Sequence, residues 1–329
     1  MSRPPEFKTL RATLSTSLTA TLGTPRLLRY DHGPHPLEDL PGHVRAASSI
    51  RRQGHRLVIL QDDVSALAVL DPGTGSTQPI LLPAGPDGAR VFDDSRGNKK
   101  FKMDLEACVV LPDERLVAFG SGSSPQREKI VTIASGKGAM AQQLSGSDFY
   151  ASLRVHAAAH DTRLNIEGAV VHGDWLRLLQ RGIGKRGSGS WNAILDLSLN
   201  RFVGWLDGRN PLPSVRRILE VDLGAVAGVP LGFTDAAVAD DGRVAFLACA
   251  EDTDDVLSDG PVLGCRFGWL DPDDRAAVMT TIVDRDGQPT QLKLEGIEIR
   301  LDGGSVFDVV ADMDRGDEPA QLVELIVRE

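Results

Sequence analysis

The amino-acid sequence predicts an all-β protein, and three observations support this fold class. Short apolar or alternating runs of about five to eight residues fill almost the whole chain of 329 residues. Turn-forming pairs such as DG, GS and PD separate these runs, and the 34 Gly and 19 Pro are spread along the sequence rather than gathered in one linker. Patterns with the period of a helix are nearly absent.

A repeat of about sixty residues organises these runs. Five segments share one order: a polar residue, a small residue, a strand, a turn, a second strand and a polar cluster. The leading polar residues are 58, 61, 68 and 60 positions apart, and they are Ser48, Glu106, Glu167, Asp235 and Glu295. Units of this length with four strands each predict a β-propeller of five blades, with repeats starting near residues 46, 104, 165, 233 and 293.

The outer strands of each repeat follow the first hairpin. We expect REKIVTIA and YASLRV in the second repeat, and NAILDLSL and RRILEVDLG in the third. The fifth repeat offers KLEGIEI, SVFDVVADMD and AQLVELIV and is one strand short, so the N-terminal FKTLRATLSTSL is expected to complete it and close the ring. Residues 1–329 then form a single domain. A sixth blade built from residues 1–46 is the alternative, but that segment lacks the repeat signature.

The charge balance limits the partners. The formal net charge of −10 is the wrong sign for a protein that binds a nucleic-acid backbone, and it favours a cation as the charged partner. The N-terminus lacks the apolar core of a secretory signal, and no run is long enough for a membrane helix. We expect a cytoplasmic protein with no membrane partner; the sequence does not indicate an oligomeric state.

Three cysteines, Cys108, Cys249 and Cys265, lie in apolar, strand-like runs such as ACVVLP and VAFLACA. Their number is odd and their spacing wide. The sequence therefore favours buried thiols over a disulfide framework, a zinc site or a catalytic nucleophile.

A ring of oxygen ligands is expected at one mouth of the tunnel. The first strand of each blade lines the tunnel, so the five leading polar residues would gather as one hydroxyl and four carboxylates. Four carboxylates this close need a compensating cation or protonation. An all-oxygen ligand set predicts Ca²⁺, with Mg²⁺ as the alternative. In the other interpretation, the carboxylates pair with nearby cationic side chains, namely Arg51, Lys102, Arg154 and Lys293.

Residues at the ends of the second strands and in the following loops are expected around the same mouth. Asp62 and Asp63 are the candidate catalytic residues, because either could position a water molecule beside the cation. The candidate substrate-binding residues are Arg127, Arg181, Lys185, Arg186, Glu251 and Asp312. A cation ringed by acids, with basic side chains at the rim, suits a small phosphorylated ligand.

The phrases ASSI…LQDD, LEACVVLPDERL, IEGAVVHGDWLRLLQR, GFTDAAV and KLEGIEI resemble the calcium-activated nucleotidase (apyrase) family. The resemblance spans all five repeats from about Ala46 onward as short motifs. It implies a five-bladed propeller with calcium in its tunnel and hydrolysis of nucleoside di- and triphosphates. The LEG-type first strand also resembles phytase-like propellers, which keeps other phosphate esters open as substrates.

The resemblance also implies roles for single residues. Ser48, Glu106, Glu167 and Glu295 fall on the family's tunnel ligands, and Asp235 stands where the family has a serine in its GFSS phrase. Asp62 and Asp63 match the DD pair after the first hairpin, and Arg181 matches an arginine after a third-blade strand. The fourth-blade strand departs from the family: it reads LACAED, with Ala250 or Glu251 where the family has a lysine near the phosphate.

Two functions follow from this sequence. The first is a metal-dependent hydrolase of a phosphorylated small molecule, in which Arg181 steadies the phosphate. The second is a non-catalytic propeller in which a central calcium is structural and the mouth binds a ligand or a protein. The Asp pair and the basic rim favour the first function, and the missing fourth-blade base favours the second.

Overall fold

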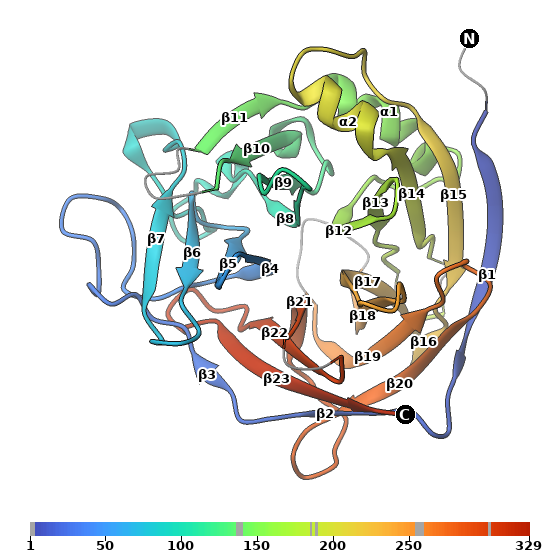
Figure 1. The fold of residues 1–329 in the computed structure, drawn as a ribbon. Coiled ribbons are helices and arrows are strands. Elements are labelled where there is room, and N and C mark those ends of the chain that lie inside the picture. The colour runs from blue at the N-terminus through green and yellow to red at the C-terminus, as the bar shows by residue number, and fades with distance from the viewer. Residues whose placement is uncertain (1–3, 136–140, 185, 188–189, 254–259, 302–303) are drawn as a thin grey trace.

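The computed structural model describes residues 4–135, 141–184, 186–187, 190–253, 260–301 and 304–329. Almost all of its regular structure is β, and the strands are arranged around a central axis (Figure 1). Hydrogen bonds join the described strands into five antiparallel groups of four, which we call sheets I to V. The chain is therefore an all-β propeller, as its sequence predicted.

Sheets I and II are separate four-stranded units formed from consecutive stretches of chain. Sheet I contains β4 (Ala47–Gln53), β5 (Arg56–Gln61), β6 (Ala66–Leu70) and β7 (Thr77–Leu81). Sheet II contains β8 (Leu105–Val110), β9 (Leu116–Gly120), β10 (Lys129–Ile133) and β11 (Ala141–Ser145). A two-residue turn joins β4 to β5, and its first residue, Gly54, has a φ of +62° that favours glycine.

Sheets III, IV and V follow the same order. Sheet III contains β12 (Ile166–His172), β13 (Trp175–Gln180), β14 (Ala193–Ser198) and β15 (Val215–Asp222). Sheet IV contains β17 (Val229–Val238), β18 (Val244–Glu251), β19 (Val262–Leu270) and β20 (Ala277–Val283), with the short β16 (Ala225–Val226) beside β17. Sheet V contains β21 (Lys293–Ile299), β22 (Val306–Asp312), β23 (Gln321–Arg328) and one strand from the N-terminal region.

The strand that completes sheet V is β2 (Thr19–Leu22), antiparallel to β23. An N-terminal segment thus closes this sheet as predicted, but not with the residues predicted. The expected segment, residues 7–18, mostly forms β1 (Glu6–Leu14), which runs parallel to the outer strand β15 and then to β20, and so clasps sheets III and IV. Burial explains the difference, because Ala20 and Leu22 are buried whereas most of β1 is exposed.

Residues 4–46 do not form a sheet of their own within the described part of the chain. The remaining short strand there, β3 (Arg26–Leu27), pairs with β23 of sheet V. The alternative of a sixth blade built from this segment is therefore not observed.

A cluster of buried apolar side chains fills each junction between neighbouring sheets. One cluster joins sheets I and II, and others join II and III, III and IV, and IV and V. The last joins V back to I, where Val310 of β22 packs with Ile50 and Ile59. Burial of apolar surface is the main stabilising term in folding, so these five clusters hold the first strands around one closed tunnel.

Two helices lie on the outside of sheets II and III (Figure 1). They are α1 (Ser147–Ala158) and α2 (Leu199–Leu206), and Phe149 of α1 packs against Phe202 of α2 and Phe119 of β9. The expectation that YASLRV forms the fourth strand of the second repeat was wrong, because these residues lie in α1 and β11 takes that place. The segment buries Tyr150 and Leu153, which are three positions apart, a helical spacing.

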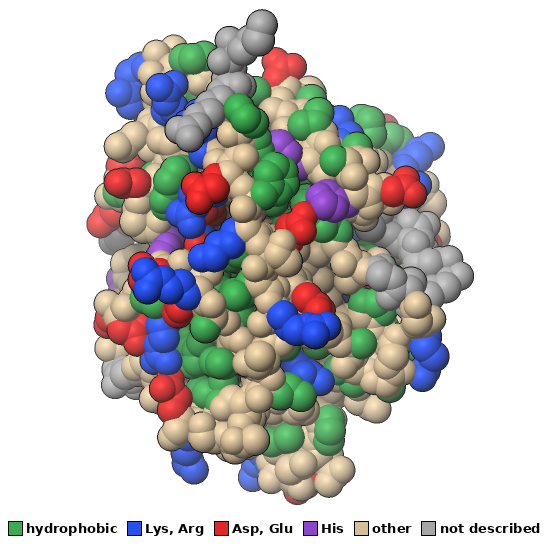
Figure 2. Space-filling view, turned by 90° about the vertical axis from the view of Figure 1, so that its right-hand side faces the viewer, with side chains coloured by type: hydrophobic (Ala, Val, Ile, Leu, Met, Phe, Trp, Pro, Cys, Tyr) green, Lys and Arg blue, Asp and Glu red, His purple; other side chains and the backbone are tan. Residues whose placement is uncertain are grey.

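The side of the molecule that carries β1 has a mixed surface. Figure 2 shows Lys and Arg side chains interspersed there with Asp, Glu and hydrophobic side chains. Phe7 and Leu14 of β1 are exposed, but the surroundings carry both signs of charge. No helix among the described residues is long and apolar enough to cross a membrane.

Candidate functional site at the tunnel mouth

The first strand of every sheet carries the same irregularity. In each first strand, one residue has no partner in the register with the second strand, which identifies a β-bulge. A bulge changes the direction in which the side chain of the unpaired residue points. The skipped residues are Ser48, Glu106, Glu167, Thr234 and Glu295. Of these five residues, Ser48, Glu106, Glu167 and Glu295 line one cavity at the end of the tunnel, and Thr234 is buried outside its lining.

Four of these five residues are those predicted for the ring, and the fourth sheet differs. Its bulge residue is Thr234, whereas Asp235 follows the bulge and pairs with Leu247. Asp235 thus belongs with the small residues that come next in the other sheets, such as Gly168 and Gly296. At these positions the first strands of neighbouring sheets pack closely against each other. For example, a Cβ added to Gly168 of sheet III would lie 3.2 Å from Asp235 Cα of sheet IV. The expected place of Asp235 in the ring is corrected to Thr234.

Asp235 instead forms a buried ion pair with Arg51 of β4. The Arg51 guanidinium also donates to the carbonyl oxygens of Ala169, Ala236 and Ile297. Those acceptors lie on the first strands of sheets III, IV and V, so one arginine of sheet I contacts four of the five sheets inside the tunnel. A charge so buried is tolerated because the carboxylate and the carbonyl groups satisfy it.

A cavity of about 50 Å³ lies at this end of the tunnel. We call it the mouth. Ionisable side chains dominate its described lining, with seven carboxyl groups against five Lys or Arg side chains. They are Asp62, Asp104, Glu106, Glu167, Glu251, Glu295 and Asp312, with Lys99, Lys102, Arg127, Arg181 and Lys293.

Burial makes the bulge carboxylates difficult to ionise. It raises the pKa of Glu106 well above its usual range, and the charges of Asp104, Glu167 and Asp62 raise that pKa further. Burial also raises the pKa of Glu295, although Lys293 and Arg181 oppose the shift. The pKa of Glu167 is raised for the same reason, with Arg181 as the main opposing charge. Each of these carboxylates would gain from a further positive charge.

One wall of the mouth holds a compact acidic group. Oxygens of Asp62, Asp104 and Glu106 lie within 4.8 Å of one another. The Lys102 ammonium lies 2.6 Å from Asp62 Oδ2 and 2.6 Å from Asp104 Oδ1. Burial raises the pKa of Asp104, but the positive charges of Lys102 and Arg127 lower it by more. The pKa of Asp104 is therefore below its usual range. Lys102 is therefore the resident counterion of this wall.

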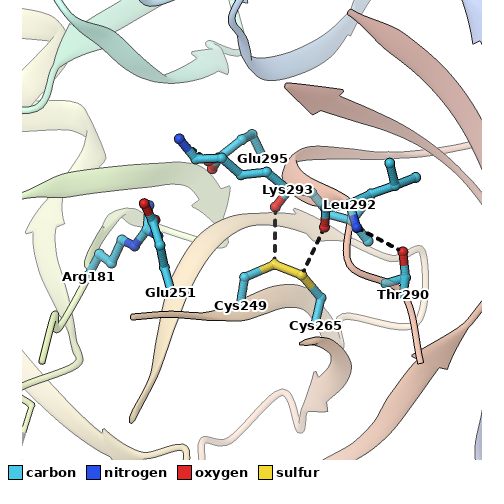
Figure 3. Close-up of a disulfide and its surroundings, with 9 residues drawn as sticks. Arg181, Cys249, Glu251, Cys265, Thr290, Leu292, Lys293 and Glu295 are labelled. Atoms are coloured by element: carbon cyan, nitrogen blue, oxygen red, sulfur yellow. Dashed lines mark hydrogen bonds and ion pairs between the residues drawn. A yellow bond between two sulfur atoms is a disulfide. The ribbon is translucent and has the colours of Figure 1, made fainter. Parts of the chain in front are cut away.

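Two of the three arginines predicted to bind substrate, Arg127 and Arg181, line the mouth and form ion pairs with carboxylates. Arg127 Nη1 lies 3.0 Å from Asp104 Oδ2. Arg181 Nη2 lies 2.5 Å from Glu251 Oε2, and its Nη1 lies 3.5 Å from Glu167 Oε2 (Figure 3 shows Arg181 and Glu251 side by side). Glu251, which stands where the resembled family has a base, thus neutralises Arg181.

A second, larger cavity of about 520 Å³ adjoins the mouth. The two cavities share Asp62, Lys102 and Asp312 in their linings. Asp63, the other candidate catalytic residue, lines only the larger one and is bound by Arg45, whose Nε lies 2.9 Å from Asp63 Oδ2. Burial, with a contribution from Asp62, raises the pKa of Asp63 to about 7, and burial raises that of Asp312 to about 8.

The remaining predicted residues are dispersed. Lys185 lies outside the described residues. Arg186 donates to the carbonyl oxygen of Ala227 and does not line the mouth. Lys293 pairs with Glu295 at 3.5 Å and with Asp314 at 3.0 Å, as the ion-pair interpretation expected, whereas Arg154 pairs with Glu128 outside the mouth.

Two buried oxygens at the bulges have no hydrogen-bond partner among the described residues. They are Thr234 Oγ1 and Glu295 Oε2. Ser48 is satisfied, because its hydroxyl donates to the carbonyl oxygen of Leu105, and Glu167 accepts from the Asn165 amide. A buried polar atom without a partner is costly, so two such oxygens at equivalent positions fit a ligand that accepts their lone pairs, as a hard cation does.

Sequence reasoning missed a disulfide beside the mouth. Cys249 of β18 and Cys265 of β19 are directly opposite each other and are joined, and the buried Cys108 remains a free thiol as predicted. The expectation of thiols at Cys249 and Cys265 was wrong because only the register of the two strands brings these residues together. In Figure 3 the disulfide lies beneath Glu251, Lys293 and Glu295.

Comparison with known proteins gives a family without an assigned activity. The model of a family described as "Family of unknown function (DUF6929)" matches residues 43–327. No curated protein matches the chain.

Several solved structures are similar at low identity. The mannose phosphorylase MPT-4 from Leishmania mexicana, in complex with phosphate ion, is 14% identical with a TM-score of 0.46, over 92% of this chain and 88% of that one. A glutaminyl cyclase from Myxococcus xanthus is 13% identical with a TM-score of 0.46, over 99% and 100%. The Cps50 (Swd1) β-propeller domain from Myceliophteria thermophila is 8% identical with a TM-score of 0.40, over 91% and 99%. None of their activities is attributed to this chain.

Proposed function

The chain belongs to DUF6929, a family of unknown function, and we propose from the chemistry of its tunnel mouth that it is a calcium-binding propeller. One divalent cation binds at the bulge residues. The cation-loaded mouth then recruits a small phosphorylated molecule and hydrolyses it.

The unpartnered oxygens at the bulges carry the first part of this proposal. Thr234 Oγ1 and Glu295 Oε2 have no partner among the described residues, although both side chains are buried. The lining of the mouth has seven carboxyl groups against five Lys or Arg side chains, and burial raises the pKa values of Glu106, Glu167 and Glu295. A divalent cation would satisfy the oxygens and favour the ionised form of these carboxyls, and a cavity of about 50 Å³ has room for an ion with a few waters.

The residues that would hold the cation are Glu106, Glu167 and Glu295, with Thr234 and Ser48 as neutral oxygen ligands. Calcium accepts six to eight oxygens in flexible, often pentagonal arrangements, whereas magnesium demands a near-ideal octahedron. Ligands offered from five positions around a tunnel suit calcium better, and magnesium is the alternative. When bound, such a cation polarises a phosphoryl oxygen or lowers the pKa of a bound water.

The larger cavity supports the second part of the proposal. The mouth itself is too small for a nucleotide or a sugar phosphate, but the adjoining cavity of about 520 Å³ falls in the usual range of ligand pockets. Asp62 lies at the junction of the two cavities, within 4.8 Å of Glu106, where its carboxylate could orient a water toward a phosphate. Lys102 is at the same junction and would attract the phosphate.

A non-catalytic role is the second candidate, and the occupancy of the arginines favours it. Arg127 is paired with Asp104, and Arg181 with Glu251 and Glu167. A phosphate would have to compete with these carboxylates. In this second candidate, the cation only joins the first strands of the sheets, and the larger cavity binds a ligand or partner without chemistry.

Calorimetric titration of chelator-stripped protein with calcium tests the cation site. We expect one calcium per chain, and at least about tenfold weaker binding in Glu167→Gln and in Glu295→Gln, equivalent to about 1.4 kcal/mol each. Glu298→Gln is the matched control, because Glu298 lies on β21 beside Glu295 but accepts from the backbone of Arg52 and Ile299. Equal calcium affinity in wild type and all three variants would reject a cation site formed by the bulge residues.

Assays of nucleotides, phytate and simple phosphoesters with calcium, magnesium or chelator separate the two candidates. Turnover that requires the cation supports the hydrolase. Calcium binding without turnover of any phosphorylated compound would reject the hydrolase and support the non-catalytic propeller.

A further inference from the structure

The disulfide Cys249–Cys265 lies between two walls of the mouth. Cys249 is two residues before Glu251, the partner of Arg181. On the other side the two sulfurs face β21, the strand that carries Lys293 and the bulge residue Glu295 (Figure 3). Both cysteines are buried, so any change in the separation of their sulfurs must be absorbed by these neighbours.

Each sulfur has a backbone carbonyl oxygen within the range of an S–H donor. Cys249 Sγ lies 3.6 Å from the oxygen of Leu294, and Cys265 Sγ lies 3.4 Å from the oxygen of Leu292. A disulfide has no proton to donate, so in the oxidised state these are only contacts. In the dithiol state both thiols find an acceptor already in place, and neither becomes a buried donor without a partner. The surroundings therefore accommodate both redox states.

The two acceptors lie on either side of Lys293, and Leu294 immediately precedes Glu295. Breaking a disulfide increases the sulfur–sulfur separation from about 2 Å to the roughly 3.5–4 Å of unbonded atoms. Both cysteines are only 1% exposed, so we expect the extra separation to move β18 and β19 apart or to press them on β21. Either movement displaces Glu251 or Glu295 and so alters the mouth.

We propose that Cys249 and Cys265 form a redox switch that sets the cation affinity of the mouth, with the disulfide as the high-affinity state. The inference rests on the proposed cation site. The chemical step is thiol–disulfide exchange with a low-molecular-weight dithiol. One dithiol thiolate attacks a protein sulfur to form a mixed disulfide, and the second displaces the protein thiolate, leaving two protein thiols and an oxidised cyclic disulfide.

The test compares calcium affinity in the two redox states of the full chain. Wild-type protein is equilibrated with oxidised or reduced dithiothreitol, the states are verified by thiol alkylation and mass spectrometry, and each is titrated with calcium. We expect reduction to weaken binding by about fivefold or more, the lower end of usual coupling between sites. By reciprocity, calcium lowers the midpoint potential of the pair by about 20 mV for a fivefold effect.

Variants make the comparison specific. Cys249→Ser/Cys265→Ser should bind calcium like reduced wild type and show no redox response, and Cys108→Ser should keep the response because it alters a buried thiol outside the pair. If the double variant does not fold, the midpoint potential of the cysteine pair in wild type, measured with and without calcium, tests the switch instead. Equal potentials would overturn it.

The outcomes separate the inference from the function on which it rests. Equal calcium affinity in both redox states, or a pair that cannot be interconverted in folded protein, overturns the switch alone. Absence of calcium binding in both states overturns the cation site and the switch with it.

Discussion

Arg51 donates two hydrogen bonds to the Asp235 carboxylate inside the tunnel, from Nη1 to Oδ2 at 2.8 Å and from Nη2 to Oδ1 at 2.6 Å. Removing one partner of a buried pair leaves an uncompensated charge and usually costs about 3–5 kcal/mol. We therefore expect Asp235→Asn to lower the free energy of unfolding by about that amount, measured by urea denaturation. Arg51→Met/Asp235→Asn should recover part of the loss because it removes both charges. A stable Asp235→Asn protein would contradict this structural role.

Thr234→Val tests separately how the buried hydroxyl affects stability without a cation and how it contributes to calcium binding. Without a cation, Thr234 Oγ1 is buried and unpartnered, so replacing it with a methyl group should leave the free energy of unfolding unchanged or raise it by about 1 kcal/mol. With saturating calcium, the variant should gain less thermal stability than wild type, because it has lost one ligand. Thr132→Val is the control, because Thr132 lies on β10, the third strand of sheet II, away from the bulges. The idea fails if calcium stabilises all three proteins equally.

The contribution of Asp63 and Asp312 to the stability of the cation-free protein should fall as the pH rises. Burial raises the pKa of Asp63 to about 7 and that of Asp312 to about 8, from a usual 3.8. The folded chain therefore holds these protons more tightly than the unfolded chain. Stability is lost as pH rises from about 4 to about 8, because the folded state binds more protons throughout that window. Below about pH 4 both states are protonated and the contribution is constant.

Denaturation in chelator across this pH range checks the prediction. Asp312→Asn should lose the part of the pH dependence that Asp312 causes, and a difference between wild type and Asp312→Asn that does not grow in favour of the variant as pH rises would refute the assignment.

Asp62 and Asp63 should behave differently. Asp62 lies where the mouth meets the larger cavity, so Asp62→Asn should lower kcat on a phosphorylated substrate by about 10²-fold or more, the usual effect of a lost acid–base group. Asp63 lines only the larger cavity and is bound by Arg45, so Asp63→Asn should leave kcat within a few-fold of the wild-type value. Steady-state kinetics and melting curves on both variants distinguish the roles. Comparable kcat in Asp62→Asn and wild type would exclude Asp62 from the chemistry.

The repeat predicted much of this architecture because it records a local pattern. A polar residue, a small residue and an apolar strand identify the bulge in four sheets, at Ser48, Glu106, Glu167 and Glu295. In the fourth sheet the phrase FTD offers two adjacent polar residues, and only the strand register decides between Thr234 and Asp235. Sequence spacing alone cannot resolve a shift of one residue.

The remaining differences have non-local causes. The parallel pairing of β1 with β15 and β20 joins residues more than 200 positions apart and leaves no local signal. The Cys249–Cys265 pairing depends on the register of β18 and β19. Lys102 was expected to pair with a ring carboxylate, but its partners are Asp62 and Asp104, which only the tertiary structure brings together.

Anomalous diffraction from crystals grown in saturating calcium tests the central claim most directly. We expect one anomalous peak at the mouth, within the usual calcium–oxygen range of about 2.3–2.6 Å from carboxylate oxygens of Glu106, Glu167 and Glu295. The peak should be absent in Glu295→Gln and present in Glu298→Gln. Ordered mouth side chains in calcium-saturated wild-type crystals, with no anomalous peak among them, would contradict the account.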